Sequence, residues 1–351
     1  MLTDFLAFTL AHKGLAHNKL THNKLTDTGS ADTGPPQSHG ELPGGATWRW
    51  LGAGVLECLP AAPAAPAAAS VVLSAGIHGD ETAPIEILSA LVAAIAVGEV
   101  PLRVRLLVLL GNVAAMRAAR RYLDDDLNRL FGGRHRVLPE SREALRAMML
   151  EQAVSEFFAG AGESRLHLDL HTAIRPSVFE RFALLPQRDA PYEPDIFAWL
   201  GALGIEAVLL HRSASGTFAH YSSSEHQALA CTLELGKVMP FGRNDLSRYA
   251  ALADGLRRLL ATALQVSAAA VPLPRVFDVV ASLDKRSAEF ILPVGDGMPN
   301  FTAYPRGTLV AQDGDYRYQV THDEERIVFP NPRVKVGLRA GLMVVERKAP
   351  E

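Results

Sequence analysis

Cysteine is scarce in this sequence. Only Cys58 and Cys231 occur in 351 residues, and they lie far apart along the chain. Two distant cysteines exclude the disulfide framework that stabilises many small secreted domains, and they suit a reducing compartment. We therefore expect a cytoplasmic protein in which neither thiol is functional. Cys231 opens an apolar stretch and is expected to be a small buried side chain.

Long apolar runs are lacking as well. No stretch reaches the roughly 18 uninterrupted apolar residues that a membrane-spanning helix needs, since Pro63 and Pro66 interrupt the segment Ala61 to Ala69. The apolar start, Met1 to Leu10, contains Asp4 and has no basic leading segment or small-residue cleavage site, so it does not read as a signal peptide. The sequence predicts a soluble protein with no membrane partner.

The sequence also lacks an excess of charge of one sign. Lys and Arg number 35 and Asp and Glu number 38, for a net charge of -3. Nothing in this balance indicates a nucleic-acid partner, because such partners are usually bound by a strongly basic surface. A small-molecule substrate remains the expected partner, and the oligomeric state is left open.

The length of the chain favours two domains over one compact core. Short buried strands such as Val71–Leu73 and Arg103–Leu110 alternate with helices, which is typical of an α/β protein with a mostly parallel or mixed central sheet flanked by helices. We predict an N-terminal segment at 1–45, partly loop, a catalytic domain at 46–270 and a small β-rich domain at 271–351. A tandem repeat at 17–26 is read as a local duplication in a loop.

Two segments of the catalytic domain carry specific expectations. Residues 140–158 predict a helix whose core-facing positions are Leu145, Met148, Met149, Ala153 and Phe157. Residues 216–225 are rich in Gly, Ser and Thr, and they predict a flexible loop over the site.

His78 and Glu81 lie three residues apart where a strand gives way to a helix. The flanking Gly76 and Gly79 permit the sharp turn that such a junction requires. Open α/β sheets keep their sites at this edge of the sheet, and the spacing of the two side chains suits a metal ion. An isolated pair of this kind can also be a surface turn with an incidental histidine, so a further ligand is needed.

A third ligand comes from the strand Arg165–Thr172. Its alternation places His167, Asp169 and His171 on one face, opposite three leucines. One of these histidines, added to His78 and Glu81, gives the His₂Glu set that leaves zinc an open position for catalysis. We choose His171, because it lies at the carboxyl end of the strand, whereas His167 is about 13 Å further down at roughly 3.3 Å per residue.

Glu234 lies between two leucines at the end of another apolar strand, and a buried carboxylate there needs a reason. It could pair with Lys237 or with an arginine. It is also the right residue for a general base, with a pKa raised by burial so that it accepts a proton near neutral pH. We predict the catalytic role.

The charge-dense segment 120–131 follows neither a strand nor a helix period. It could be a solvated loop held by ion pairs. Alternatively, Asn128 and Arg129 form a clamp for a substrate carboxylate, and Arg121 places a charge near the metal. Arg175, on the loop after the His171 strand, is a further candidate for binding a carboxylate, although a lone loop arginine is more often a surface residue.

Four motifs together resemble the succinylglutamate desuccinylase family of the aspartoacylase and zinc-carboxypeptidase superfamily. They are the segments 76–84, 125–131, 169–175 and 232–237, and the C-terminal segments 329–332 and 337–342 extend the resemblance through most of the chain. The N-terminal repeat and its Pro-rich continuation depart from the family, which is shorter there.

The resemblance implies a carboxypeptidase-like fold with one Zn²⁺ per chain on His78, Glu81 and His171. It implies Glu234 as general base or acid, Asn128 and Arg129 as substrate clamp, and Arg121 as the group that polarises the carbonyl. The implied reaction is hydrolysis of N2-succinyl-L-glutamate to succinate and L-glutamate, the last step of arginine catabolism by the succinyltransferase route. The alternatives are an aspartoacylase-like hydrolase of another N-acyl amino acid, a peptide-cleaving zinc carboxypeptidase, and a non-catalytic binding module.

Overall fold

The computed structural model describes residues 2–11, 38–61, 69–160, 162, 164–262 and 272–347. The repeat at 17–26, and with it part of the predicted N-terminal segment, lies outside the described residues. The chain forms two compact units, which are described separately. The first comprises Met1–Leu170, Gly216–Ala230 and Met239–Gln265, and the second comprises His171–Ser215, Cys231–Val238 and Val266–Glu351. Two strands, β6 (Arg165–Ala173) and β9 (Leu229–Lys237), have residues in both units.

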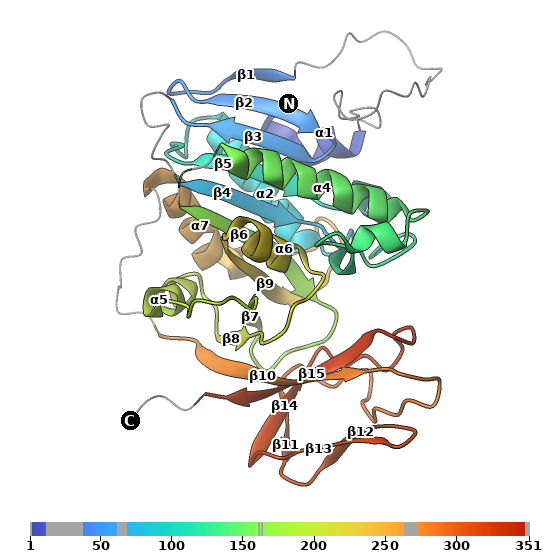
Figure 1. The fold of residues 1–351 in the computed structure, drawn as a ribbon. Coiled ribbons are helices and arrows are strands. Elements are labelled where there is room, and N and C mark those ends of the chain that lie inside the picture. Colours follow the sequence, from blue (N-terminus) through green and yellow to red (C-terminus); the bar gives the residue numbers. More distant parts are fainter. Residues whose placement is uncertain are drawn as a thin grey trace. The chain divides into compact units, whose positions relative to one another are not determined.

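The first unit contains a mixed sheet with the strand order β1-β2-β3-β5-β4-β6 (Figure 1). Strand β4 pairs in parallel with β5 and with β6, and β3 pairs antiparallel to β5. The buried apolar runs that predicted strands before and after the His78 turn thus form neighbouring central strands. The bounds are β1 His39–Glu41, β2 Thr47–Gly52, β3 Val55–Leu59, β4 Ser70–Ala75 and β5 Arg105–Leu110.

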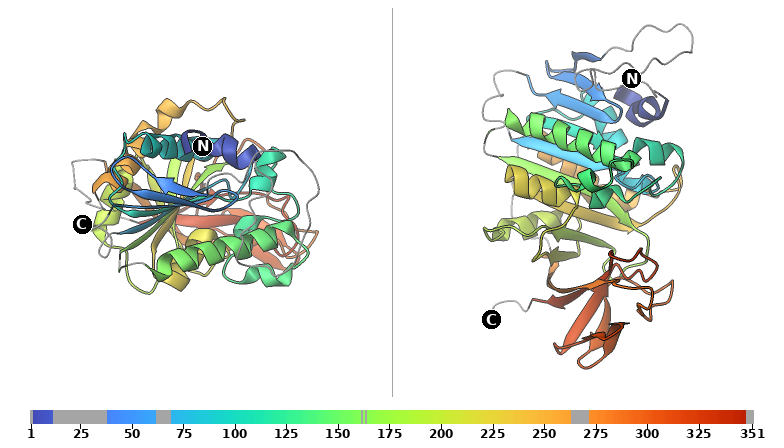
Figure 2. Two further views of the ribbon diagram at one scale, coloured as in Figure 1. Left: turned by 90° about the horizontal axis from the view of Figure 1, so that it is seen from above. Right: turned by 45° about the vertical axis from the view of Figure 1, so that its right-hand side comes forward.

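Helices cover both faces of this sheet. In Figure 2, α4 and α6 lie on one face, and α2 and α7 lie on the other. Among the described residues, none of the helices is both long and apolar enough to cross a membrane. The helices of the first unit are η1 Leu2–Asp4, α1 Phe5–Ala11, α2 Thr82–Ala96, α3 Val113–Arg117, η2 Leu127–Arg129, η3 Arg134–Val137, α4 Arg142–Ala159, α6 Phe218–His226, η4 Leu246–Tyr249 and α7 Ala250–Thr262.

Helix α4 forms where it was expected, but its buried face was predicted wrongly in part. Leu145 is 58% exposed and Met148 is 43% exposed, whereas Ala153 and Phe157 are buried as expected. The first half of the helix buries the small side chains Ala144 and Ala147, which let the helix backbone approach the sheet closely, and the second half buries larger ones such as Phe157. The apolar side chains of Leu145 and Met148 led to a wrong prediction of the face that is buried.

Helix α6 replaces the flexible loop predicted at 216–225, so that prediction is wrong. Thr217 caps the helix by accepting a hydrogen bond from His220 N at 3.3 Å. Phe218 and Tyr221, one turn apart, are buried. The Ser-rich composition suggested a loop, but two aromatic side chains on one face are enough to bind the helix to the core.

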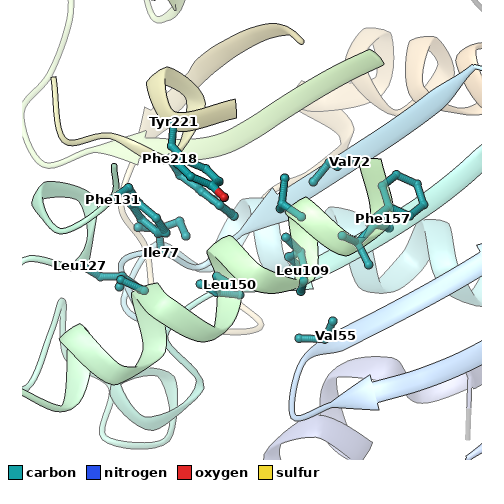
Figure 3. Close-up of a cluster of buried hydrophobic side chains, with 14 of the residues drawn as sticks. Val55, Val72, Ile77, Leu109, Leu127, Phe131, Leu150, Phe157, Phe218 and Tyr221 are labelled. Atoms are coloured by element: carbon teal, nitrogen blue, oxygen red, sulfur yellow. The ribbon is translucent and has the colours of Figure 1, made fainter. Parts of the chain in front are cut away.

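One large apolar cluster lies between helix α4, helix α6 and the sheet of the first unit (Figure 3). Phe131 stacks on Phe218 with ring centroids 4.3 Å apart and an interplanar angle of 16°. Leu150 and Phe157 of α4 also belong to this cluster, with Val72 from β4. Burying side chains of this kind contributes on the order of 1.5–3 kcal/mol each. This core packs beside the loop that precedes Phe131, in which Asn128 and Arg129, the predicted clamp residues, lie.

The second unit is rich in strands, as predicted for the C-terminal part of the chain. Its strand order is β9-β7-β8-β10-β15-β14-β11, with a separate pair β12-β13. Strand β10 pairs in parallel with β8 and antiparallel with β15. The bounds are β7 Arg181–Leu185, α5 Pro194–Ala202, β8 Ala207–Leu210, β10 Arg275–Asp284, β11 Thr302–Pro305, β12 Leu309–Asp313, β13 Tyr316–Gln319, β14 Glu324–Val328 and β15 Arg339–Glu346. Cys58 and Cys231 are buried and form no disulfide.

Candidate metal centre

The turn between β4 and α2 places His78 and Glu81 at the carboxyl end of a central strand. Gly76 has a φ of 66°, a backbone conformation that other residues adopt with strain. A Cβ atom on Gly79 would lie 2.3 Å from Met116 N, so this position has no room for a side chain. Glu81 is the N-cap residue of α2. The two glycines of the motif are therefore needed to bring His78 and Glu81 to this edge.

The His78 ring is held by carboxylates on both sides. Its Nδ1 lies 2.7 Å from Glu81 Oε1, and its Nε2 lies 2.9 Å from Asp126 Oδ1. His78 is 4% exposed and Glu81 is 1% exposed. A carboxylate that accepts the outer N–H of a histidine fixes the ring and its tautomer, as is usual for metal-binding histidines.

His171 completes a group of three buried side chains. In β6 it follows Leu170, and Leu170 is the register partner of Ala75 at the end of β4. His78, Glu81 and His171 each offer one ligand atom, and these atoms all lie within 4.8 Å of one another. The structure thus brings together the three residues that were predicted as ligands.

Asp126 is ionised beside this group. Burial opposes ionisation of Asp126, but nearby cations, Arg129 first among them, hold the pKa of its carboxyl well below the usual range. An ionised Asp126 accepts a hydrogen bond from Nε2 of His78 at 2.9 Å. The other ring nitrogen, Nδ1, lies 2.7 Å from Glu81 Oε1. Imidazole nitrogen and carboxylate oxygen are both ligands that zinc prefers, so this pair could hold the ion together with His171.

His167, the rejected alternative ligand, belongs to a different buried network. Ser74 Oγ donates to Asp169 Oδ1 at 2.6 Å and lies 2.8 Å from His167 Nε2. His167 Nδ1 lies 2.7 Å from Ser222 Oγ. Because the Ser74 proton goes to Asp169, the serine oxygen accepts from the histidine, and Ser222 donates to the other ring nitrogen. Hydroxyl groups engage both ring nitrogens, which agrees with the choice of His171.

The predicted carboxylate clamp lies directly after Asp126. Asp126 caps the short helix η2 by accepting from Asn128 N at 3.0 Å. The Asn128 side-chain oxygen accepts from Phe218 N, the first residue of α6, at 3.0 Å. This contact engages the side-chain oxygen of Asn128 and not its amide nitrogen. Helix α6 therefore positions Asn128, a residue of the predicted clamp, instead of forming a mobile cover.

The Arg129 side chain is partly exposed. Its Nη1 donates to Asn128 O at 2.9 Å, and its Nη2 lies 3.9 Å from Asp126 Oδ2. The side chain is 36% exposed, so a dissolved anion can reach the guanidinium. Gly216 passes close by, since a Cβ atom there would lie 2.5 Å from Arg129 O. These contacts hold the backbone of the clamp while leaving its cation accessible.

Arg121 is the cation closest to the predicted ligands in the first unit. Its Nη1 donates to Glu81 Oε1 at 2.6 Å, and its carbonyl oxygen accepts from Gly79 N at 3.0 Å. Burial would lower the pKa of Arg121, but the carboxylates of Glu81 and Asp126 raise it, and the net direction is upward. Arg121 is thus held as a permanent positive charge beside a ligand.

Besides His171, two predicted site residues belong to the second unit. Glu234 lies in β9, opposite Phe182 of β7, and is 7% exposed. Arg175 donates from Nη1 to the carbonyl oxygens of Gly295 at 2.6 Å and Asp296 at 3.1 Å. Arg175 therefore ties its own loop to the segment 295–298, and its role toward a substrate stays a prediction.

The sequence patterns did not indicate the residues that support this site. Asp126 lies in the 125–131 motif, but nothing in that motif pointed to its contact with His78. Glu143 is only 1% exposed in the first turn of α4. The helical pattern could not predict its burial, because an acidic residue in a first turn is also stable when it faces solvent.

Comparison with known families decides the relationship of this chain. Residues 67–260 match the succinylglutamate desuccinylase/aspartoacylase catalytic domain, and residues 273–347 match the AstE/AspA barrel-sandwich hybrid domain. The chain belongs to the succinylglutamate desuccinylase/aspartoacylase family. This confirms the predicted fold class, a mixed sheet with flanking helices and a smaller β-rich domain.

Members of the family resemble this chain over almost its whole length. It is 55% identical to the succinylglutamate desuccinylase of Burkholderia lata, covering 99% of this chain and 94% of that protein. The crystal structure of the succinylglutamate desuccinylase from Chromobacterium violaceum is 41% identical, with a TM-score of 0.81 and 99% of each chain covered. The Vibrio parahaemolyticus structure of the same name is 34% identical, also with a TM-score of 0.81, and covers 88% of this chain and 91% of its own.

Proposed function

We propose that this protein hydrolyses the amide bond of N2-succinyl-L-glutamate to give succinate and L-glutamate, the last step of arginine catabolism by the succinyltransferase route. The observation that carries the proposal is the near full-length similarity, at 55% identity, to a protein named succinylglutamate desuccinylase. The group of His78, Glu81 and His171 supports the same reaction class. Scarce cysteines favour a cytoplasmic location.

One zinc ion per chain is the cofactor in this proposal. His78, Glu81 and His171 would hold it, since each offers one ligand atom and these atoms all lie within 4.8 Å of one another. A zinc ion bound by two His and one Glu supplies Lewis acidity, which lowers the pKa of water to about 7 and polarises a carbonyl group. Asp126 keeps the His78 ring in the orientation that such binding needs.

The protein side chains perform the proton transfers and stabilise charge. In the proposed reaction Glu234 takes the proton of the attacking water and returns it to the amine nitrogen of the departing glutamate. Arg121, held as a cation next to Glu81, stabilises the negative charge that develops on the carbonyl oxygen. A donor of this kind contributes about 2.7–4 kcal/mol to the transition state in other hydrolases.

The substrate has three carboxylates and no positive charge, so its binding needs cations. Arg129 and the amide of Asn128 form the clamp for one carboxylate, since an arginine fork beside an amide donor matches its geometry. Arg175 is the proposed contact for another. The carboxylate of the succinyl group distinguishes succinylglutamate from the aspartoacylase substrate N-acetylaspartate, whose acetyl group is uncharged.

A substrate panel tests the proposed function. The purified protein with zinc should release glutamate from N2-succinyl-L-glutamate much faster than it releases amino acid from N-acetyl-L-glutamate or N-acetyl-L-aspartate. A preference for N-acetylaspartate would instead favour the aspartoacylase-like alternative. A zinc-loaded protein that releases no amino acid from any of the three would contradict the proposal as a whole.

Arg129→Ala should weaken substrate binding without removing zinc. The substitution deletes the cation of the clamp, and a charge-assisted hydrogen bond contributes about 1.5–3 kcal/mol, so KM should rise by roughly 10- to 100-fold. Steady-state kinetics and metal analysis measure the two effects. Arg136→Ala, an exposed arginine of η3, is the control and should behave as the wild type. Unaltered KM and kcat in Arg129→Ala would contradict the clamp and favour the alternative that Arg129 belongs to a solvated surface loop.

A further inference from the structure

Glu143 is a buried carboxylate outside the group of proposed ligands, the base and the clamp. It lies at the second position of α4 and is 1% exposed. Four N–H groups point at it. They are Asn112 Nδ2 at 3.0 Å and Leu123 N at 2.7 Å, both to Oε1, and Asp124 N at 3.1 Å and Asp125 N at 3.3 Å, both to Oε2.

Three of these donors are consecutive backbone amides of one loop. A row of backbone N–H groups converging on an anion is a strong and rigid arrangement, and each bond to an ionised acceptor is stronger than a neutral one. Burial would raise the pKa of Glu143, but the bonds from Asn112 and from the loop amides lower it, and the net direction is downward. The carboxylate is therefore ionised while it holds the loop.

The loop held by Glu143 carries two groups of the candidate metal centre. Arg121 lies two residues before the first bonded amide and donates to Glu81 at 2.6 Å. Asp126 follows the last bonded amide directly and contacts His78 at 2.9 Å. Asn112, the fourth partner, caps α3 by accepting from Ala115 N at 3.1 Å. Glu143 thus joins the start of α4 and the cap of α3 to the segment between Arg121 and Asp126.

We propose that Glu143 is a positioning residue, whose carboxylate sets the place of Arg121 and Asp126 beside the ligands His78 and Glu81. This inference rests on the proposed function for its kinetic readout. The clamp should be less affected, because Asn128 has its own contact with Phe218 at the start of α6. The consequence expected is a loss in kcat with little change in KM.

Glu143→Gln is the first test. The amide group keeps the size of the side chain, but its NH₂ meets N–H donors of the loop, so at least one bond is lost. We expect kcat to fall by about 10- to 100-fold, as misplacement of groups that support a site does elsewhere, while KM and zinc content stay near wild-type values. A raised KM with unchanged kcat in the zinc-loaded variant would overturn the inference.

Val154→Ala is the matched control for stability. Val154 is fully buried in the same helix, eleven residues later, about 16 Å along the helix axis. It should lower the melting temperature through lost packing and leave kcat per folded molecule unchanged. Equal kcat in Glu143→Gln and Val154→Ala, each measured well below its melting temperature, would show that Glu143 contributes only to stability.

A second control concerns the outer contact of the same loop. Asp124 also accepts from the exposed Arg142 side chain, at 2.6 Å. Arg142→Ala removes this exposed ion pair, which is expected to contribute little. Its kcat should remain within about twofold of the wild type. A loss in Arg142→Ala as large as that in Glu143→Gln would overturn the assignment to Glu143.

A readout without catalysis separates this inference from the proposed function. Amide hydrogen exchange of residues 121–126 should be faster in Glu143→Gln than in the wild type, and unchanged in Val154→Ala. If the wild type releases no glutamate from N2-succinyl-L-glutamate, the proposed function fails, and this exchange experiment still decides the role of Glu143. Unchanged exchange overturns it. If Glu143→Gln does not fold, Glu143→Asp is the second variant. It keeps the charge but shortens the side chain, so the carboxylate lies further from the loop amides. Its kcat should also fall, and its amide exchange at residues 121–126 should also be faster.

Discussion

Glu234→Gln should abolish most turnover and leave the fold, the zinc content and the substrate affinity nearly intact. Glu234 is 7% exposed in β9, between two fully buried leucines, and the amide is almost isosteric with the carboxyl group. An amide cannot accept the proton of the attacking water. The loss in kcat should be at least the ~10²–10⁴-fold typical of general acid–base catalysis.

The same variant distinguishes catalysis from structure. If Glu234 only pairs with a cation such as Lys237, the substitution should lower the melting temperature and spare kcat per folded molecule. Measurements of kcat, zinc content and thermal unfolding on one preparation separate the two roles. Glu225→Gln, an exposed position in α6, serves as the matched control and should leave all three unchanged. Near-normal kcat with bound zinc would rule out the proposed proton transfers.

His171→Ala should remove nearly all bound zinc from a protein that otherwise holds about one ion per chain, and His78→Ala should do the same. Loss of one ligand leaves too few of the usual protein ligands of a catalytic zinc site. Because the proposed reaction uses the metal to polarise the substrate carbonyl, activity should fall to background in parallel. Metal analysis after gel filtration, together with glutamate release, measures both effects.

The control for this experiment is a histidine away from the group. His39 is exposed in β1, and His39→Ala should keep zinc and activity. Full zinc occupancy in His171→Ala would contradict the ligand assignment, and His167 would then become the candidate third ligand. Its present contacts with Ser74 and Ser222 make that outcome unexpected, since a metal would have to replace a hydroxyl partner.

The turn that carries His78 and Glu81 could be predicted from local sequence, and the structure contains it between β4 and α2. Three local features determine it, each within a few residues. They are a β-branched run, a glycine with positive φ and a proline in the first helical turn. The relative positions of His167 and His171 could be predicted in the same way. Strand alternation and the rise per residue place the two side chains along β6 without knowledge of any other segment.

The supporting network of the site could not be predicted in this way. Asp126 contacts a histidine 48 residues earlier in the chain, and Glu143 binds a loop about 20 residues before it. No local period encodes such pairs, because they depend on how α4 and the loop pack on the sheet. Packing against the core also explains why Phe218–His226 forms a helix. It explains why α4 buries Ala144 and Ala147 while Leu145 stays exposed.

The sequence by itself determined the strand and helix alternation, the three candidate ligands, the buried Glu234 and the likeness to a family of amide hydrolases. These features depend on backbone preferences and side-chain periodicity, which act within one element. Only the tertiary structure decided that Asp126 contacts His78, that the Asn128 side-chain oxygen accepts from Phe218 N, and that Glu143 accepts from the backbone amides between Arg121 and Asp126. Those features depend on desolvation and hydrogen bonding between distant segments, and burial of the intervening core establishes them.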